Sequence, residues 1–146
     1  PMLDRDANMW MIVAGKEGPL PSPSHQRWIE VGWTSDPHSL IAASDVFILP
    51  NRETFFDLIM LEVLSLGVPI VATDTGGNRY FRKFENVGIK LYSDSDGLAA
   101  SVSAIREMSP SERQILRESN KALFASEFGC VQFAKRYSAL IGGLCG

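Results

Sequence analysis

The most constraining feature of this chain is a helical pattern within residues 51–77, whose sequence is NRETFFDLIMLEVLSLGVPIVATDTGG. The helix is expected to end at Gly67, with Pro69 just beyond it. Apolar side chains stand on nearly every side, so the helix lacks a polar face and is expected to be buried. One carboxylate, Glu62, interrupts the run. Because a buried carboxylate without a partner is costly, Glu62 is expected to be paired or to face a ligand that offers hydroxyl groups.

Short apolar runs alternate with helical patterns along the 146 residues, enough for one well-formed core. Strands are predicted at 10–14, 28–31, 46–49, 70–73 and 88–92. Helices are predicted at 36–43, 57–67, 109–126 and 131–141, and the chain is expected to be mainly helical after residue 92. Uninterrupted apolar strands separated by helices are typical of a parallel sheet with both faces covered. The sequence therefore predicts a doubly wound, Rossmann-like α/β domain with a helical C-terminus.

Composition excludes several classes of function. The net charge of −3 argues against a surface for nucleic acid, which usually needs a basic field. Cys130 and Cys145 form no CxxC pair, and the two histidines lie far from both, which argues against a metal site. The two cysteines favour a reducing, cytoplasmic setting, with peripheral association at the inner membrane surface left open. No apolar run approaches the roughly 20 residues of a membrane span.

Ligands of such sheets bind beyond the carboxyl ends of the strands, and three loops are expected at that edge, at 32–34, 51–57 and 74–78. Gly76 and Gly77 allow close backbone approach and a positive φ, which suit an anion. The helix that starts at Asp57 offers free amides and the positive end of its dipole to a diphosphate. Glu62 lies about 8 Å further along, a distance that suits the ribose hydroxyls of the same nucleotide.

Structural roles remain open for each of these residues. Glu62 could be satisfied by backbone amides, the Gly76-Gly77 pair could be a simple turn, and Trp33 could be an aromatic at the core edge. The cluster of Arg79, Arg82 and Lys83 could meet phosphate or acceptor, although a solvated basic face is the plainer interpretation.

The order and spacing of several blocks resemble one known family. The blocks are WMIVAGKEG, IEVGW, LIAASDVFILPN, TFFDLIMLEVLSLGVPIVAT, TGGN and GIKLY. Together they resemble the C-terminal, donor-binding half of retaining glycosyltransferases of the GT-B fold, a group that includes glycogen synthases and bacterial mannosyl- and glucosyltransferases.

The resemblance implies a role for each matching residue. In that family the second Glu of an E-x7-E motif holds the donor ribose, and Glu62 is the matching residue. The amides after the first acid hold the diphosphate, which here implies Phe56, Asp57 and Leu58. The positions of Gly32 and Trp33 lie against the base in the family.

Two positions depart from the family pattern. The first motif acid, which contacts the transferred sugar, is replaced by Thr54, unless the neighbouring Glu53 takes its place. These two residues are therefore the catalytic candidates. The family's glycine after the motif Phe is Asp57, which puts a carboxylate beside the expected diphosphate. Pointing inward, it would weaken diphosphate binding; pointing away, it would only favour the helix dipole.

The resemblance also implies what lies outside the chain. Residues 1–146 correspond to a nucleotide-sugar-binding domain that lacks its first strand and helix, with their Arg and Lys, and the N-terminal acceptor domain. The isolated chain is therefore expected to bind nucleotide weakly and to catalyse no measurable reaction.

The implied reaction transfers a sugar from a nucleotide-diphosphate donor to an acceptor hydroxyl with retention, without a metal or another cofactor. The acceptor, a saccharide or a lipid-linked molecule, would bind through the N-terminal domain, and the sequence leaves the oligomeric state open. Two alternatives remain: a GT-B nucleotide-sugar epimerase, and a non-catalytic nucleotide-binding or assembly module.

Overall fold

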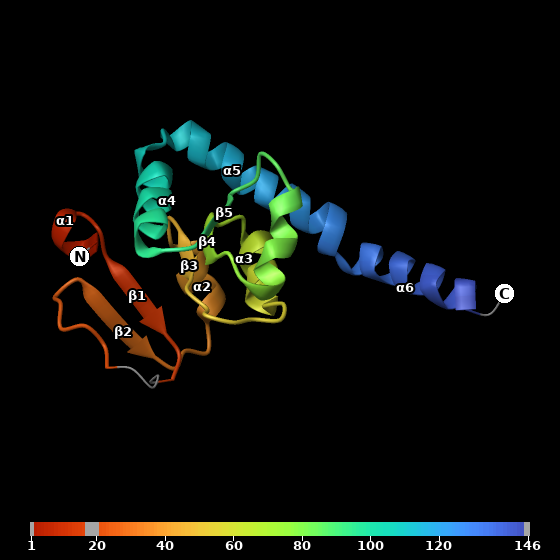
Figure 1. Cartoon of the computed structure of the whole chain (residues 1–146), viewed down its shortest axis with the longest axis horizontal. Helices are drawn as coiled ribbons and strands as arrows, with labels where there is room; N and C mark the ends of the chain where they lie inside the picture. The colour runs from red at the N-terminus through yellow and green to blue at the C-terminus, as the bar shows by residue number, and fades with distance from the viewer. Residues whose placement is uncertain (1, 17–20, 145–146) are drawn as a thin grey trace. The chain divides into compact units, whose positions relative to one another are not determined.

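The structure is a computed structural model that describes residues 2–16 and 21–144. It divides into two compact units, Pro1–Leu40 and Ile41–Gly146. Figure 1 draws the elements of both units in chain order.

The first unit contains a short parallel sheet. Its elements are α1 (Met2–Arg5), β1 (Met11–Ala14) and β2 (Trp28–Gly32), and α2 (Pro37–Ala42) begins near its end. β1 pairs with β2 with Met11 opposite Trp28. The Arg27 guanidinium donates hydrogen bonds to the carbonyls of Leu3, Asp6 and Met9, which ties α1 to the start of β2.

The second unit contains a three-stranded parallel sheet in the order β3-β4-β5. The strands are β3 (Phe47–Leu49), β4 (Ile70–Thr73) and β5 (Ile89–Tyr92). The five strands predicted from the sequence are all present within one or two residues. Among the described residues, the strands pair as two parallel sheets, β1-β2 in the first unit and β3-β4-β5 in the second.

Helices surround the second sheet (Figure 1). They are α3 (Leu58–Leu66), the 3₁₀ helix η1 (Gly76–Lys83), α4 (Ser95–Glu107), α5 (Pro110–Leu123) and the π-helical turn η2 (Phe124–Phe128). α6 (Cys130–Leu144) follows η2 and extends away from this sheet. α5 begins with the predicted capping box between Ser109 and Glu112. α3 stops at Gly67 as predicted; Gly67 is its C-cap and adopts the left-handed conformation, with φ 79°. Parallel strands with flanking helices confirm the predicted α/β class.

The core of the second unit lies between α3 and β4. Met60, Val63 and Leu64 of α3 are completely buried, as are Ile70 and Val71 of β4. The expectation that α3 has no wet face was wrong. Three of its side chains are exposed: Leu58, Glu62 and Ser65.

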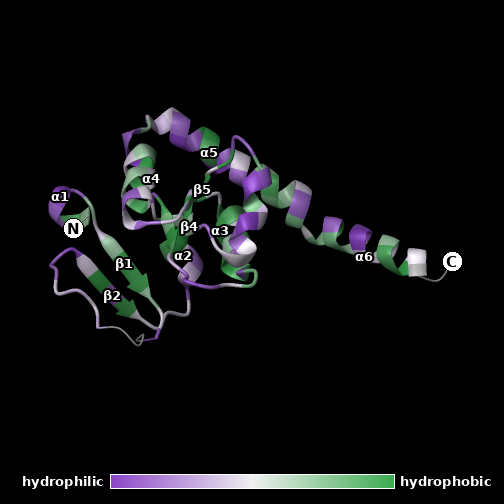
Figure 2. Ribbon diagram, in the orientation of Figure 1, coloured by the Kyte–Doolittle hydropathy of each residue, from purple (hydrophilic) through white to green (hydrophobic). Residues whose placement is uncertain are grey.

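α6 carries alternating hydrophobic and hydrophilic bands (Figure 2). Large apolar side chains on it are exposed: Val131, Phe133, Tyr137, Leu140 and Ile141. Within residues 2–16 and 21–144, none of the helices combines the length and hydrophobicity that a membrane span requires.

Candidate functional site

Two of the three predicted loops lie side by side at one edge of the second sheet. β3 leads into residues 50–57, and β4 leads into residues 74–75 and then η1. Because β3 and β4 are adjacent and parallel, both loops leave the same edge. The third loop, with Gly32 and Trp33, belongs to the first unit. Gly32 has the positive φ of 65° that favours glycine, and the Trp33 side chain is 79% exposed.

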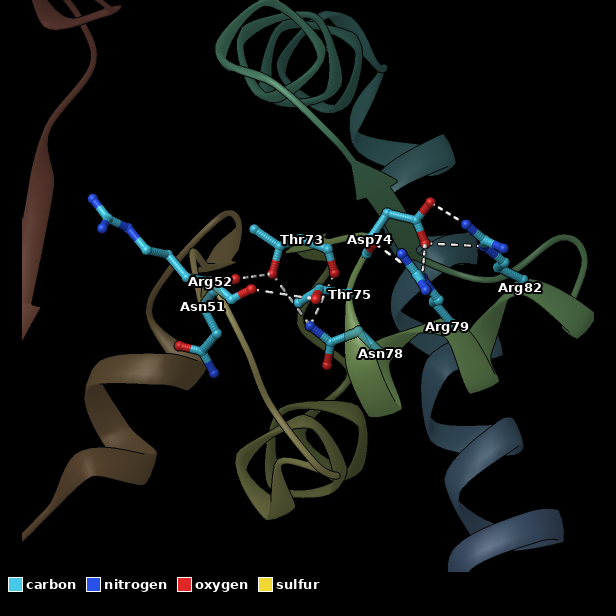
Figure 3. Close-up of polar contacts among 8 residues, drawn as sticks. All are labelled: Asn51, Arg52, Thr73, Asp74, Thr75, Asn78, Arg79 and Arg82. Atoms are coloured by element: carbon cyan, nitrogen blue, oxygen red, sulfur yellow. Dashed lines mark hydrogen bonds and ion pairs between the residues drawn. The ribbon is translucent and has the colours of Figure 1, made fainter.

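Hydrogen bonds join the two adjacent loops (Figure 3). They run from Thr73 Oγ1 to the Asn51 carbonyl (2.6 Å), from Thr75 Oγ1 to the Arg52 carbonyl (3.3 Å) and from the Gly77 amide to the Thr54 carbonyl (3.2 Å). The backbone that leads into α3 is therefore held by side chains and an amide of the loop after β4.

The glycine pair makes this contact possible. A Cβ atom on Gly76 would lie 1.7 Å from the Thr54 carbonyl oxygen, and one on Gly77 would lie 1.6 Å from the Phe55 carbonyl oxygen. Gly76 also has the predicted positive φ, at 45°. The close backbone approach predicted for this pair is present, and its partner is the protein's own loop. The expected contact with an anion stays a prediction.

Aromatic side chains also contact the loop that precedes α3, through Phe56. The Phe56 ring stacks on Phe81 at 5.7 Å between centroids and meets Tyr80 at 6.0 Å and Phe128 at 6.4 Å. The neighbouring Phe55 side chain is 98% exposed. The hydrogen bonds to the carbonyls of Arg52 and Thr54, together with the ring contacts of Phe56, thus fix the path of the chain into α3.

The N-terminus of α3 is arranged so that its capping residue does not cap. Asp57 is the N-cap in extended conformation, yet its carboxylate accepts no hydrogen bond from the helix amides. It accepts one from Asn51 Nδ2 instead. The first amides of any α-helix have no partner within the helix. At α3 the nearest carboxylate therefore does not occupy these amides at the positive end of the dipole.

Glu62 lies on the exposed side of α3, beside a shallow hollow of about 290 Å³. The hollow is lined by Leu58, Leu61, Glu62, Ser65, Phe124 and Phe128. The carboxylate is thus accessible from solvent, next to apolar surface and one and a half turns from the start of α3. Its assignment to ribose stays a prediction.

The two catalytic candidates differ in exposure. Glu53 is exposed, whereas Thr54 is half-buried and its carbonyl accepts from the Gly77 amide. Both lie in the stretch that precedes α3. Whether either one replaces the first motif acid stays a prediction.

Sequence reasoning missed one buried polar residue at this edge, Asn78. Asn78 is fully buried and donates from Nδ2 to the Thr73 carbonyl at 3.0 Å. Its Oδ1 is shielded from solvent, and no residue of the described ranges donates to it. An unpaired buried acceptor costs about 1–3 kcal/mol. The sequence signal was the group of short polar residues in the segment directly after β4, which are Asp74, Thr75 and Asn78.

The basic cluster proves to be partly neutralised. Arg82 forms an ion pair with Asp74, and Arg79 Nε donates to the Asp74 carbonyl at 3.2 Å (Figure 3). Lys83 Nζ lies 3.8 Å above the Tyr80 ring. Arg79 and Arg82 remain more than half exposed. The hydrogen bond from Arg82, helped by the positive charges of Arg82 and Arg79, lowers the pKa of Asp74.

The lowered pKa of Asp74 predicts a pH dependence of stability. A carboxyl whose pKa is lower in the folded state stabilises the fold above its unfolded pKa, and this contribution is lost as the pH falls through the folded pKa. We expect wild type to lose stability relative to Asp74→Asn as the pH drops below about 4. Urea unfolding of both proteins between about pH 6 and pH 3 measures this difference. A difference that stays constant over that range would contradict the prediction.

Comparison with known proteins identifies the family. Residues 2–108 match the family model of glycosyl transferases group 1. Because the match covers more than half of the chain, this protein belongs to that glycosyltransferase family.

Within residues 2–16 and 21–144, no group of three or more His, Cys, Asp or Glu side chains is placed to hold a metal ion.

Two curated relatives are glycosyltransferases of bacterial glycoconjugate synthesis. Over 66 residues, the chain is 35% identical to the Escherichia coli UDP-Gal:alpha-D-GlcNAc-diphosphoundecaprenol alpha-1,3-galactosyltransferase. The aligned segment covers 45% of this chain and 17% of that relative. Over 75 residues, the chain is 28% identical to the lipopolysaccharide core biosynthesis glycosyltransferase LpsE of Rhizobium meliloti. That aligned segment covers 51% of this chain and 22% of LpsE. The matches thus span about a fifth of each relative.

Solved structures show the same fold. The Anabaena protein HepE in complex with UDP superposes with a TM-score of 0.70 at 21% identity, over 80% of this chain and 32% of HepE. The complex of HepE with UDP-glucose gives a TM-score of 0.68 at 20% identity, over 81% of this chain and 33% of HepE. At this identity the likeness establishes the fold, which is that of a GT-B glycosyltransferase.

Proposed function

We propose that this chain is the donor-binding part of a retaining glycosyltransferase that moves a hexosyl group from a nucleotide-diphosphate sugar to an acceptor hydroxyl. One observation carries the proposal. The start of α3, with its N-cap carboxylate turned aside, and the accessible Glu62 lie on one helix at the sheet edge where ligands of parallel α/β folds bind. Membership of the family and the UDP complexes of HepE support it.

The donor diphosphate would accept hydrogen bonds from the amides of Phe56, Asp57 and Leu58. An anion is favoured there by the free N–H groups and by the helix dipole. As the sugar leaves, negative charge grows on the diphosphate, and fixed dipoles aimed at that charge lower the barrier. Gly76 and Gly77 would line the same edge, and Gly32 and Trp33 would contact the base.

Glu62 would grip the ribose. A carboxylate can accept hydrogen bonds from two neighbouring hydroxyls, and such charge-assisted bonds are about twice as strong as neutral ones. Leu58 and Phe128 of the hollow would flank this contact with apolar surface. Thr54 or Glu53 would contact the transferred sugar in place of the first motif acid.

Acceptor binding would depend on residues outside this chain. The acceptor, a saccharide or a lipid-linked molecule, would be bound by an N-terminal domain, and the whole enzyme would act in the cytoplasm or at the inner face of the membrane. The proposed chemistry requires no metal or other cofactor. A non-catalytic nucleotide-binding module is the second candidate, because Thr54 replaces the acid at the reacting sugar.

Calorimetric titration of the chain with UDP and GDP tests nucleotide binding. We expect one of them to bind, and Glu62→Gln to weaken that binding about 10- to 100-fold, because two hydrogen bonds to a charged group are replaced by weaker ones. The same substitution is expected to have little effect on the 2′,3′-dideoxy form of that nucleotide, which lacks both hydroxyls.

Glu118→Gln serves as the matched control, because Glu118 is an exposed carboxylate on α5. It should leave the affinity unchanged. Absence of binding by both nucleotides would refute the donor-binding proposal. Binding with an equal loss for normal and dideoxy nucleotide would remove Glu62 from the ribose contact. Sugar transfer by the intact protein would separate an enzyme from a binding module.

A further inference from the structure

A directed series of hydrogen bonds leads from η1 to the N-cap of α3. Asn78 Nδ2 donates to the Thr73 carbonyl at 3.0 Å, and Thr73 Oγ1 donates to the Asn51 carbonyl at 2.6 Å. Asn51 Nδ2 in turn donates to the Asp57 carboxylate. The final acceptor is charged, so the last bond belongs to the stronger class of hydrogen bonds. Figure 3 shows the contacts that join Asn78, Thr73 and Asn51.

We infer that Asn51 is a positioning residue that holds the Asp57 carboxylate away from the first amides of α3. An aspartate at the N-cap normally accepts a hydrogen bond from the second or third helical amide. Asp57 stands in the extended conformation of an N-cap and makes no such bond. Asn51 supplies the competing donor, so the helix amides are left to another acceptor.

Thr73 and Asn78 hold Asn51 in place. Thr73 is the last residue of β4, the central strand, whose Ile70, Val71 and Ala72 are completely buried. The backbone that carries the Thr73 hydroxyl is therefore held in place by the core. Asn78 is itself fully buried. Its amide cannot be turned over without setting Oδ1 against the Thr73 carbonyl, so its direction is determined. Asn51 is therefore anchored to the rigid centre of the sheet, whereas Arg52 and Glu53 beside it are exposed.

The arrangement explains how a carboxylate is tolerated where the family has glycine. A charged group that caps α3 would lie beside the amides of Phe56, Asp57 and Leu58 and would repel a diphosphate bound to them. Held by Asn51, the same group leaves those amides accessible. The consequence for nucleotide affinity rests on the function proposed above, while the orientation of Asp57 does not.

A double-mutant cycle on Asn51 and Asp57 tests this inference. In the full chain, Asn51→Ala is expected to free Asp57 to cap α3, so that affinity for the nucleotide that binds wild type falls about tenfold. Asp57→Ala keeps the backbone amide but removes the carboxylate that repels the diphosphate, so it should raise affinity. The double substitution should then match Asp57→Ala, because the competing carboxylate is gone. Additive losses in the double variant, or no loss in Asn51→Ala, would overturn the inference.

Amide hydrogen exchange without any nucleotide gives an independent readout. In Asn51→Ala the exchange of the Ile59 amide should slow about fivefold, because Asp57 now accepts from it. In Asn51→Ala/Asp57→Ala it should not slow. If wild type binds neither UDP nor GDP but this exchange pattern is found, the proposed function fails and the positioning role stands. If exchange of Ile59 is the same in all four proteins, the positioning role fails.

Two substitutions of Thr73 test the support of Asn51 without changing Asn51 itself, because the Thr73 hydroxyl donates to the Asn51 carbonyl. Thr73→Val removes the hydroxyl at nearly constant shape and should give a weaker form of the Asn51→Ala effects, whereas Thr73→Ser should behave like wild type. Ser119→Ala is the control, because it removes one hydrogen bond to a carbonyl on α5, far along the chain from the loops. Equal effects of Thr73→Val and Thr73→Ser on affinity and exchange would contradict the role of the hydroxyl.

Discussion

Gly77→Ala is expected to destabilise the second unit by about 3 kcal/mol or more, or to displace the loop before α3. The added Cβ would lie 1.6 Å from the Phe55 carbonyl oxygen and 2.8 Å from Phe56 Cα. Both are backbone atoms, and the loop that contains them is also held by the hydrogen bond from the Gly77 amide to Thr54. Urea unfolding measures the free energy, and calorimetry measures the accompanying loss of nucleotide binding.

Gly142→Ala is the matched control for this prediction. Gly142 lies in α6 and has no atom within 4 Å of an added Cβ. Because alanine favours a helix over glycine by roughly 1 kcal/mol, this substitution should be neutral or slightly stabilising. If Gly77→Ala unfolds at the same urea concentration as wild type and binds nucleotide equally well, the close contact between the two loops does not exist in solution.

Asn120→Ala is expected to cost about 3 kcal/mol of folding free energy, with little direct effect on the site. Asn120 is completely buried on α5; its Oδ1 accepts from the Gly88 amide at 2.7 Å and its Nδ2 donates to the Val68 carbonyl at 2.9 Å. Removing the side chain leaves both backbone groups buried without partners, next to a new cavity. Urea unfolding measures the loss.

Glu118→Ala on the same helix provides the comparison, because Glu118 is exposed and is expected to change stability by less than about 0.5 kcal/mol. Similar unfolding midpoints for Asn120→Ala and Glu118→Ala would show that Asn120 does not join α5 to the sheet. At temperatures where Asn120→Ala remains folded, its nucleotide affinity should equal that of wild type, which separates this residue from those of the site.

Local chemistry made much of the fold predictable. The apolar run at 70–73 became β4 because β-branched residues suit a strand buried on both faces. Gly67 ends α3, and Ser109 with Glu112 starts α5, because each motif satisfies helix-end groups from residues close in sequence. The place of two site loops also followed from sequence, since adjacent parallel strands deliver their loops to one edge.

The exposure of Glu62 could not be predicted in this way. The sequence around it is apolar on nearly every side, which indicated a buried helix. In the structure, Met60, Val63 and Leu64 fill the core, while Glu62 and Ser65 face the hollow beside Phe124 and Phe128. Which side of an all-round apolar helix meets solvent depends on the elements packed against it, and two of these, α5 and η2, come from the distant residues 110–128.

The sequence did not predict α1 or η1 and gave no bounds for α4. It did by itself determine the five strands, the end of α3, the start of α5, and the family to which the chain is similar. Each of these depends on neighbours along the chain. Only the tertiary structure decided that Asn51 binds Asp57, that Gly77 meets the backbone of Phe55, and that Asn78 is buried behind Thr73. These contacts join two loops separated by about twenty residues, and their hydrogen bonds depend on distances and directions that the pairing of β3 with β4 sets.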